Sequence, residues 1–217
     1  MSEDTSEGYD LSAEEARVLG VLIEKSYTTP DQYPLSLNGL TTGCNQLTGR
    51  DPVMSLEEAE VADAVASLLE RGLVGRREGA RVVKYEHLVR LRHSLPPAEQ
   101  AVLALLMLRG PQTAGELRTR SERMYRFDDV AAVHAVLDHL EEKYPPMVMP
   151  LPRAPGTKET RYVHLMCGPV DVDTVVASVG SSGAGGSGLG ARVEALEAEV
   201  AALRAELNAL KTSLGED

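Results

Sequence analysis

Apolar residues recur at helical spacing in residues 55–74, and the rest of the chain can be read around this segment. Val61, Val65 and Leu68 follow one another at intervals of four and three, which places them on one face of an α-helix. A basic segment that is typical of a two-stranded ribbon, residues 75–88, comes next. A helix followed at once by a ribbon with a basic tip predicts the end of a winged-helix domain.

The ends and the outer face of this helix are also indicated by its residues. Ser55 and Glu58 have the spacing of a capping box, and Gly72 is typical of a helix end. The outward positions are mostly acidic: Glu57, Glu60, Asp63, Ser67 and Glu70. Because such a face suits water better than DNA phosphates, we expect this helix to serve as core framework or as a contact for a protein partner.

Two further helices are expected before it. Ser12 and Glu15 have capping-box spacing, and the inner face of the first helix would hold Val18, Leu19, Leu22 and Ile23. Two prolines interrupt the chain before the second helix, which we expect over residues 36–46. Residues 1–10 are acidic and lack large aliphatic side chains, so they are expected to form a disordered tail.

The chain then repeats this arrangement. Three blocks of identical residues recur in the same order, at offsets of 84, 72 and 77: Leu11/Leu95, Glu15/Glu99, Val18/Val102, Leu19/Leu103 and Leu22/Leu106; Val61/Val133, Leu68/Leu140 and Glu70/Glu142; Tyr85/Tyr162, His87/His164 and Leu88/Leu165. This pattern predicts a duplicated unit of three helices and a ribbon. The second copy should have helices near residues 97–109, 113–125 and 128–143, and a ribbon over 147–166.

The C-terminal part has a different pattern. Residues 178–190 are mostly Gly and Ser, which predicts a flexible linker. Farther on, apolar residues alternate at steps of three and four: Val193, Leu196, Val200, Leu203, Leu207, Leu210 and Leu214. The flanking charges would form opposite-sign pairs across two parallel helices, such as Glu199 with Arg204 of a second copy. The heptad predicts a coiled coil that makes the protein a parallel homodimer. A trimer, and a helix that folds back on its own chain, stay open as alternatives.

Together these patterns predict a mainly α fold with small β-ribbons (α+β). We expect a disordered tail (residues 1–10), two tandem winged-helix domains (11–94 and 95–168), a flexible linker (169–190) and a coiled coil (191–217). The formal net charge is −11, of which the two ends, residues 1–10 and 169–217, carry −9. The two expected domains are therefore close to neutral, which leaves nucleic-acid binding open.

Composition narrows the class of protein further. The two cysteines, Cys44 and Cys167, are far apart and are expected to be buried free thiols in a reducing compartment. We see no signal peptide and no apolar run of membrane-spanning length, so a cytoplasmic protein without membrane contact is expected. There is no motif for a protease, a nucleotide-binding loop or a metal site, so we expect no enzyme, no cofactor and no metal. His87 and His164 hold equivalent repeat positions, which favours a structural role.

Four stretches of the chain are distinctive: LSAEEARVLGVLIEKSYTTPDQYPLSLNGLTTGCNQLTGRDPVM (residues 11–54), RGPQTAGELRTRSERMY (109–125), ETRYVHL (159–165) and ARVEALEAEV (191–200). They resemble the YceH-like family of uncharacterised bacterial proteins. The resemblance covers nearly all of residues 11–214. It implies two tandem winged-helix domains and a C-terminal coiled coil in a cytoplasmic bacterial protein, and it supplies no functional residues.

Double-stranded DNA is the first partner that the basic residues suggest. They gather on the first ribbon (Arg76, Arg77, Arg81, Lys84), between the two copies (Arg90, Arg92, His93) and on the expected second helix of the second copy (Arg118, Arg120, Arg123, Arg126). Arginines at such places contact phosphates, so we expect weak, salt-dependent binding of a regulatory or nucleoid-associated kind. The alternative for these residues is a solvated surface paired with nearby acids.

A non-enzymatic scaffold that binds another protein is the second expectation. Ala132, Ala135 and His139 lie where the first copy has its acidic face, and small neutral residues suit a buried contact, either with a partner or between the copies. The polar segment 38–50 has two interpretations as well. Asn45, Gln46 and Arg50 either line a small pocket or brace their own loop.

The predicted coiled coil can be tested by truncation. Deleting residues 189–217 should convert the protein to a monomer, because the heptad is the one strong association signal in the sequence. Sedimentation equilibrium would measure the change. A truncated protein that still sediments as a dimer would place the interface elsewhere.

Overall fold

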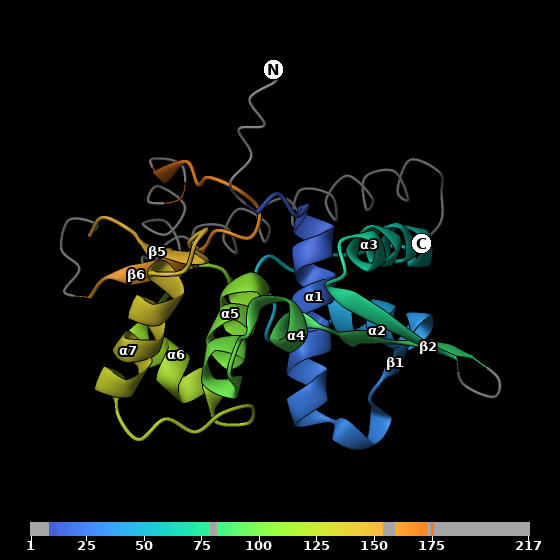
Figure 1. The fold of residues 1–217 in the computed structure, drawn as a ribbon, viewed down its shortest axis with the longest axis horizontal. Coiled ribbons are helices and arrows are strands. Elements are labelled where there is room, and N and C mark those ends of the chain that lie inside the picture. The colour runs from blue at the N-terminus through green and yellow to red at the C-terminus, as the bar shows by residue number, and fades with distance from the viewer. Residues whose placement is uncertain (1–8, 79–81, 154–158, 173–174, 176–217) are drawn as a thin grey trace, which may run out of the picture. The chain divides into compact units, whose positions relative to one another are not determined.

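The computed structural model describes residues 9–78, 82–153, 159–172 and 175 (Figure 1). Within these residues the fold is α+β, as predicted, with seven α-helices and two small antiparallel sheets. The described residues up to Val170 form one compact unit. The predicted linker, from residue 176 on, and the predicted coiled coil with its seven heptad residues lie outside the described residues.

Two successive segments have the same order of helices and strands. The first comprises α1 (Ala13–Thr28), a 3-10 turn (Pro30–Gln32), β1 (Leu35–Ser36), α2 (Leu37–Cys44), α3 (Glu58–Glu70), β2 (Val74–Glu78) and β3 (Val83–His87). The second comprises α5 (Pro97–Arg109), β4 (Gln112–Thr113), α6 (Ala114–Ser121), α7 (Val130–Glu141), β5 (Val148–Pro150) and β6 (Arg161–His164). We call these segments the first half and the second half. A short helix, α4 (Val89–His93), joins them.

The register of the two sheets confirms the predicted duplication. Strand order is β1-β3-β2 in the first half and β4-β6-β5 in the second. Val74 pairs with His87 in the first sheet, and Val148 pairs with His164 in the second. His87 and His164, which are 77 residues apart in the sequence, therefore occupy equivalent positions in the two sheets.

Two central helices, α1 and α5, hold the halves together. Every residue from Glu15 to Ile23 of α1 is buried, and so is every residue from Glu99 to Leu108 of α5. A helix that is buried on all sides belongs in the middle of a core. Figure 1 shows α1 and α5 next to each other at the centre, and each also packs against two helices of its own half. A Cβ on Gly20 would lie 3.0 Å from Leu108, so a glycine lets the two helices approach closely.

Local capping explains where the helices begin. The Ser12–Glu15 capping box of α1 is confirmed, and Thr113 and Glu116 form another at α6. The capping box predicted at Ser55 is wrong, because α3 begins two residues later with Glu57 as its N-cap.

The side chain of Asn45 accounts for this later start. Its amide donates to the Leu56 carbonyl and accepts from the Leu56 N–H, each at 2.8 Å. These two bonds hold Leu56 in the loop, so the helix cannot include it.

Two other predictions concern exposure. Cys44 is buried as predicted, but Cys167 is exposed, because it lies in the turn after β6, where only one side of the chain is covered. No helix in the described ranges has both the length and the apolar character needed to cross a membrane.

Gly43 tests the packing of α2 on α1. In a Gly43→Ala variant, the new Cβ would lie 2.7 Å from Cγ1 of Val21, a stiff β-branched side chain. We expect a loss of roughly 1–3 kcal/mol in the free energy of unfolding, measured by urea denaturation. Gly115→Ala is the matched control, because its Cβ would meet only Thr113 at 3.8 Å. Equal losses in both variants would contradict the packing argument.

Candidate functional site

The β2–β3 ribbon carries exposed arginines, and each has an acidic neighbour. The Arg76 guanidinium lies 3.6 Å from the Glu78 carboxylate, and Arg77 Nε donates to Glu86 Oε1 at 2.7 Å. Both arginine side chains are more than half exposed. Ion pairs exposed in this way contribute little to stability, so neither arginine is held strongly.

The remaining residues predicted on the ribbon are Lys84 and Arg81. Lys84 is half-buried on β3 and pairs with no carboxylate of the described residues. Arg81 lies outside the described residues.

The basic helix predicted over residues 113–125 is shorter than expected. α6 ends at Ser121, whose carbonyl accepts hydrogen bonds from the N–H groups of Met124 and Tyr125, so the chain turns there. Phe127 is 5% exposed, and burying its ring requires the chain to leave the helix axis. Arg123 and Arg126 therefore lie beyond the helix that holds Arg118 and Arg120, and the prediction that one helix carries all four arginines was wrong.

The four arginines of this region differ in their partners. Arg118 donates to the Asp128 carbonyl at 3.1 Å. Arg120 donates to the Gln112 amide oxygen at 2.8 Å and lies 3.4 Å from the Glu116 carboxylate. Arg123 and Arg126 are exposed, and neither side chain has a hydrogen bond or an ion pair within the described part of the chain.

The joint between the halves also presents bases that form no ion pair with the residues described by the structure. Arg90 and Arg92 are exposed on α4, and Leu91 between them is 80% exposed. His93 packs edge-on against Tyr9, with ring centroids 5.5 Å apart, and burial lowers the pKa of this histidine. The sequence indicated the charges here but not the helix, because five residues are too few to show a helical period.

The outer faces of α3 and α7, the third helix of each half, lack Lys and Arg. Glu60, Asp63 and Glu70 are exposed on α3, as predicted, and no Lys or Arg occurs in α3 or α7. On α7, Ala135 and His139 are exposed. Packing between the two halves therefore does not account for Ala135 and His139, whereas Ala132 is partly buried against the core.

His87 and His164 are enclosed at the ends of their strands. Burial lowers the pKa of each imidazole to about 4, so both rings are neutral at pH 7. His87 Nε2 lies 3.2 Å from Ser26 Oγ, and Nδ1 of each ring is buried without a hydrogen-bond partner. Among the residues that the structure describes, no group of three or more His, Cys, Asp or Glu side chains could hold a metal ion.

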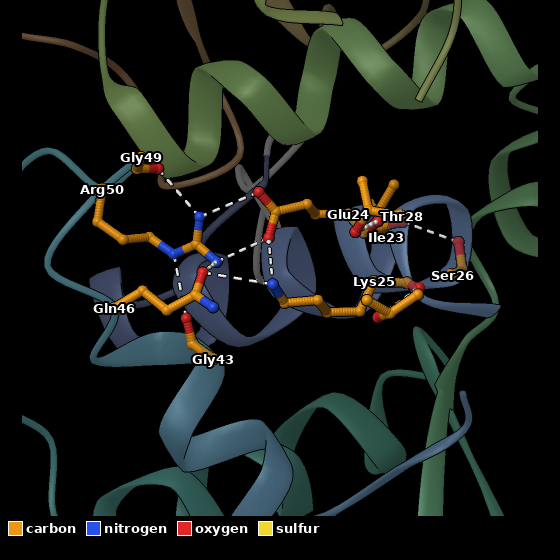
Figure 2. Close-up of polar contacts among 10 residues, drawn as sticks. Ile23, Glu24, Lys25, Ser26, Thr28, Gly43, Gln46, Gly49 and Arg50 are labelled. Atoms are coloured by element: carbon orange, nitrogen blue, oxygen red, sulfur yellow. Dashed lines mark hydrogen bonds and ion pairs between the residues drawn. The ribbon is translucent and has the colours of Figure 1, made fainter. Parts of the chain in front are cut away.

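Arg50 organises the polar segment between α2 and α3. Figure 2 shows its guanidinium facing the carboxylate of Glu24, to which it donates two hydrogen bonds of 3.1 and 2.7 Å. It also donates to Gln46 and to the carbonyls of Gly43 and Gly49. The interpretation that Arg50 and Gln46 brace their own loop is therefore the better one for these two residues.

Glu24 is held in its charged form by this arrangement. Burial would raise the pKa of the Glu24 carboxyl, but the hydrogen bond and charge of Arg50 and the charge of Lys25 outweigh burial and lower it. Lys25 Nζ lies 3.3 Å from the same carboxylate and from the Gln46 amide oxygen. The negative charge of Glu24 is thus shared by two bases.

A second buried arginine, Arg17, supports the same loop. Arg17 is a residue of α1 with a buried side chain, and it donates to the carbonyls of Cys44 and Pro52 at 3.1 and 2.6 Å. Arg17 and Arg50 together satisfy carbonyls at the C-terminal end of α2, where a helix carries partial negative charge. No pattern in the sequence predicted a role for Arg17.

A hollow lies where this loop meets the second half. We call it the junction hollow; its volume is about 350 Å³, and it is lined by Glu24, Lys25, Thr28, Gln46, Leu47, Thr48, Gly49, Arg109 and Arg123. The Asp51 N–H donates to the Leu108 carbonyl at 2.8 Å, which fixes the loop to α5 at its edge. A small pocket in segment 38–50 was one of the two interpretations of the sequence. That interpretation did not include lining residues from the second half, such as Arg109 and Arg123.

Arg109 has an unusual position in the junction hollow. It is the last residue of α5 and is half-buried, and Gly49 approaches its guanidinium so closely that a Cβ there would lie 3.0 Å from Nη2. Burial and then the charges of Arg120 and Arg50 lower the pKa of Arg109, against the opposing charge of Glu24. No side chain or carbonyl in the described ranges accepts a hydrogen bond from it.

The fold is a mixed α+β protein built from a duplicated unit of three helices and a three-stranded sheet. A family model described as "Protein of unknown function, DUF480" matches residues 11–157. The UPF0502 protein of Azoarcus sp. strain BH72 is 64% identical over 188 residues, which cover 86% of this chain and 83% of that protein. The UPF0502 protein of Aromatoleum aromaticum is 65% identical over 187 residues, with 83% and 82% coverage. The chain therefore belongs to the DUF480 (UPF0502) family, in agreement with the YceH-like resemblance.

Removing Arg50 should be far more costly than removing an exposed arginine. In Arg50→Gln, Glu24 would keep a buried charge without its main partner, and we expect a loss of roughly 3–5 kcal/mol in the free energy of unfolding. Arg71→Gln is the control, because Arg71 pairs with Asp10 at the surface, and its loss should be below about 1 kcal/mol. Urea denaturation at pH 7 would measure both.

The same two variants give a test by pH. Since the folded-state pKa of Glu24 is lowered, the ion pair stabilises the protein above the ordinary glutamate pKa of about 4.3, and this contribution is lost as the pH falls. The gap between wild type and Arg50→Gln should therefore narrow below that pH. A gap that stays constant would mean that Arg50 acts only through the carbonyl groups.

Proposed function

We propose that each half is a winged-helix domain and that the protein is a non-enzymatic DNA-binding protein of regulatory or nucleoid-associated type. Its contacts would be made with the phosphate backbone of duplex DNA. The order helix, strand, helix, helix and two-stranded ribbon supports the winged-helix assignment, and so does the placement of the short first strand beside the last. The ribbons β2–β3 and β5–β6 would then be the wings.

The observation that carries the DNA proposal is the set of exposed bases without a firm partner. Arg90, Arg92, Arg123 and Arg126 have no ion pair in the part of the chain that is described. Arg76 and Arg77 are paired, but at exposed positions. A phosphate can replace a carboxylate there at little cost, because exposed ion pairs are weak. Side chains of this kind supply backbone contacts, which fix position and carry affinity without reading sequence.

The third helices take no part in this contact. In many winged-helix proteins the third helix enters the major groove, but α3 would bring Glu60, Asp63 and Glu70 towards phosphates of like charge. α7 offers no Lys or Arg either. Contact is therefore assigned to the first wing, α4 and the connection after α6, and the binding should be weak and steeply dependent on salt.

Self-association would raise this weak affinity. We propose that the heptad of residues 191–217 forms a parallel coiled coil and thereby joins four winged-helix domains in one dimer. Linked sites bind with an effective concentration set by the linker, so weak contacts add up without any new interaction. The linker of residues 169–190 would let the domains follow the DNA.

The alternative function is a scaffold that binds another protein. One observation favours it: α7 exposes Val130, Ala131 and Ala135 on a face without Lys or Arg. The buried centre of a protein interface is depleted of charged residues, and a face without Lys or Arg agrees with that. This alternative differs from the DNA proposal in its salt dependence and in the surface that it uses.

The DNA proposal can be tested by a fluorescence-anisotropy titration with random duplex. We expect binding at micromolar protein in about 50 mM salt and a steep loss of affinity at about 200 mM. Reversing Arg76 and Arg77 to Glu should weaken binding by about tenfold or more and reduce the salt slope by about two. Reversing Glu60 and Asp63 to Lys should leave binding unchanged or strengthen it.

Arg71→Glu is the control for net charge, because this exposed arginine lies outside the proposed surface. No binding at low salt would refute the DNA proposal and favour the scaffold. If the Glu60 and Asp63 reversals weaken binding more than the wing reversals do, the assigned surface is wrong.

A further inference from the structure

The geometry points to a second binding site: we propose that the junction hollow binds a small molecule carrying a phosphate group. Its residues come from α1, from the loop around Gly49, from the end of α5 and from the connection after α6. The hollow shares Arg123 with the proposed DNA surface, but it includes neither the wing nor α4, so the proposal does not rest on DNA binding.

The size and lining of the hollow fit such a ligand. A volume of about 350 Å³ falls within the range of roughly 300–1,000 Å³ typical of small-molecule sites and exceeds what a bare phosphate ion fills. The lining is mostly polar, with the hydroxyls of Thr28 and Thr48 available to a phosphate oxygen. Leu47 is the large apolar residue of the lining and is 81% exposed, so it could cover the organic part of a ligand.

The charges of the hollow favour an anion. Lys25, Arg109 and Arg123 line it, while Glu24 is its single carboxylate. The charge of Glu24 is already balanced by Arg50, which donates two hydrogen bonds to it from a fully buried side chain. Lys25 shares the charge of Glu24 with Arg50, so the excess positive charge of the lining comes from Arg109 and Arg123, neither of which forms an ion pair within the described residues.

Arg109 is the residue that most needs a partner. A half-buried guanidinium that makes no hydrogen bond loses part of its hydration without compensation. Its position at the C-terminal end of α5 explains why a base is favourable there, but not why it lies against Gly49. Gly49 has φ +74°, and its missing Cβ leaves room for the guanidinium. The planar donors of an arginine match two oxygens of a phosphate group.

A phosphate fits this set of charges better than a carboxylate does. A phosphomonoester carries nearly two negative charges at pH 7 and has three terminal oxygens. Its two charges match the two arginines of the lining, Arg109 and Arg123, whereas a carboxylate would balance only one of them. The enclosure also suits a small molecule better than the backbone of a duplex, which presents diester phosphates on a convex surface.

Calorimetric titration of the full-length protein with phenyl phosphate would test the site. Ionic strength should be held constant with sodium chloride, and benzoate should serve as the matched carboxylate. We expect phenyl phosphate to bind more tightly than benzoate and than inorganic phosphate. Arg109→Gln should raise the Kd for phenyl phosphate by about tenfold or more, the change expected for losing a charged hydrogen bond.

Two further variants keep the test decisive if Arg109→Gln fails to fold. Arg123→Gln removes an exposed charge from the lining and should raise the Kd by about fivefold. Arg126→Gln removes the same charge three residues away, outside the lining, and should leave the Kd unchanged. Equal effects of Arg123→Gln and Arg126→Gln, or no binding of phenyl phosphate, would overturn the proposal.

Duplex DNA provides the last arm of the experiment. If Arg109→Gln and Arg123→Gln weaken DNA binding while free phosphates do not bind, these residues contact DNA and the small-molecule site is refuted. If phenyl phosphate binds and the wing variants leave its Kd unchanged, the small-molecule site is separate from the wing. That result would stand even if the protein failed to bind DNA at all.

Discussion

The packing of α1 against α5 is the interaction on which the other features depend. Each helix is enclosed over its whole middle section, so neither half covers its own central helix without the other. Gly20 permits the close approach at Leu108. This contact brings the loop after α2 to the end of α5, and it thereby creates a hollow that belongs to both halves.

Buried arginines stabilise the loop that crosses this boundary. Arg17 and Arg50 each bond to carbonyls near the end of α2, and Arg50 also neutralises Glu24. Their positive charges are used for structure, whereas those at Arg109 and Arg123 are not. Within the described residues, the same region thus contains arginines that donate to carbonyls or a carboxylate next to arginines that make no hydrogen bond, and this contrast is the basis for assigning a ligand to the hollow.

Periodicity and capping predicted much of the fold, since both depend on residues close in sequence. The bounds of α5 and the Ser12 capping box agree with the structure. The start of α3 and the end of α6 were wrong, because Asn45 and Phe127 act there from other segments. The junction hollow could not be predicted, since four separate segments form it. One signal could have indicated that Arg17 is buried. At the equivalent position of the repeat, 84 residues later, the chain has Ala101, which is apolar and buried.

The connection between the second and third helices differs between the halves. It is the longer connection in the first half, where the Asp51 N–H donates to the Leu108 carbonyl and Gly49 lies against Arg109 of the other half. The two halves are therefore not interchangeable. Reversing the order of the halves would separate this loop from the C-terminal end of α5, so a permuted chain could retain both folds and still lose the hollow. The duplication supplied two similar units, and one extended loop made them unequal.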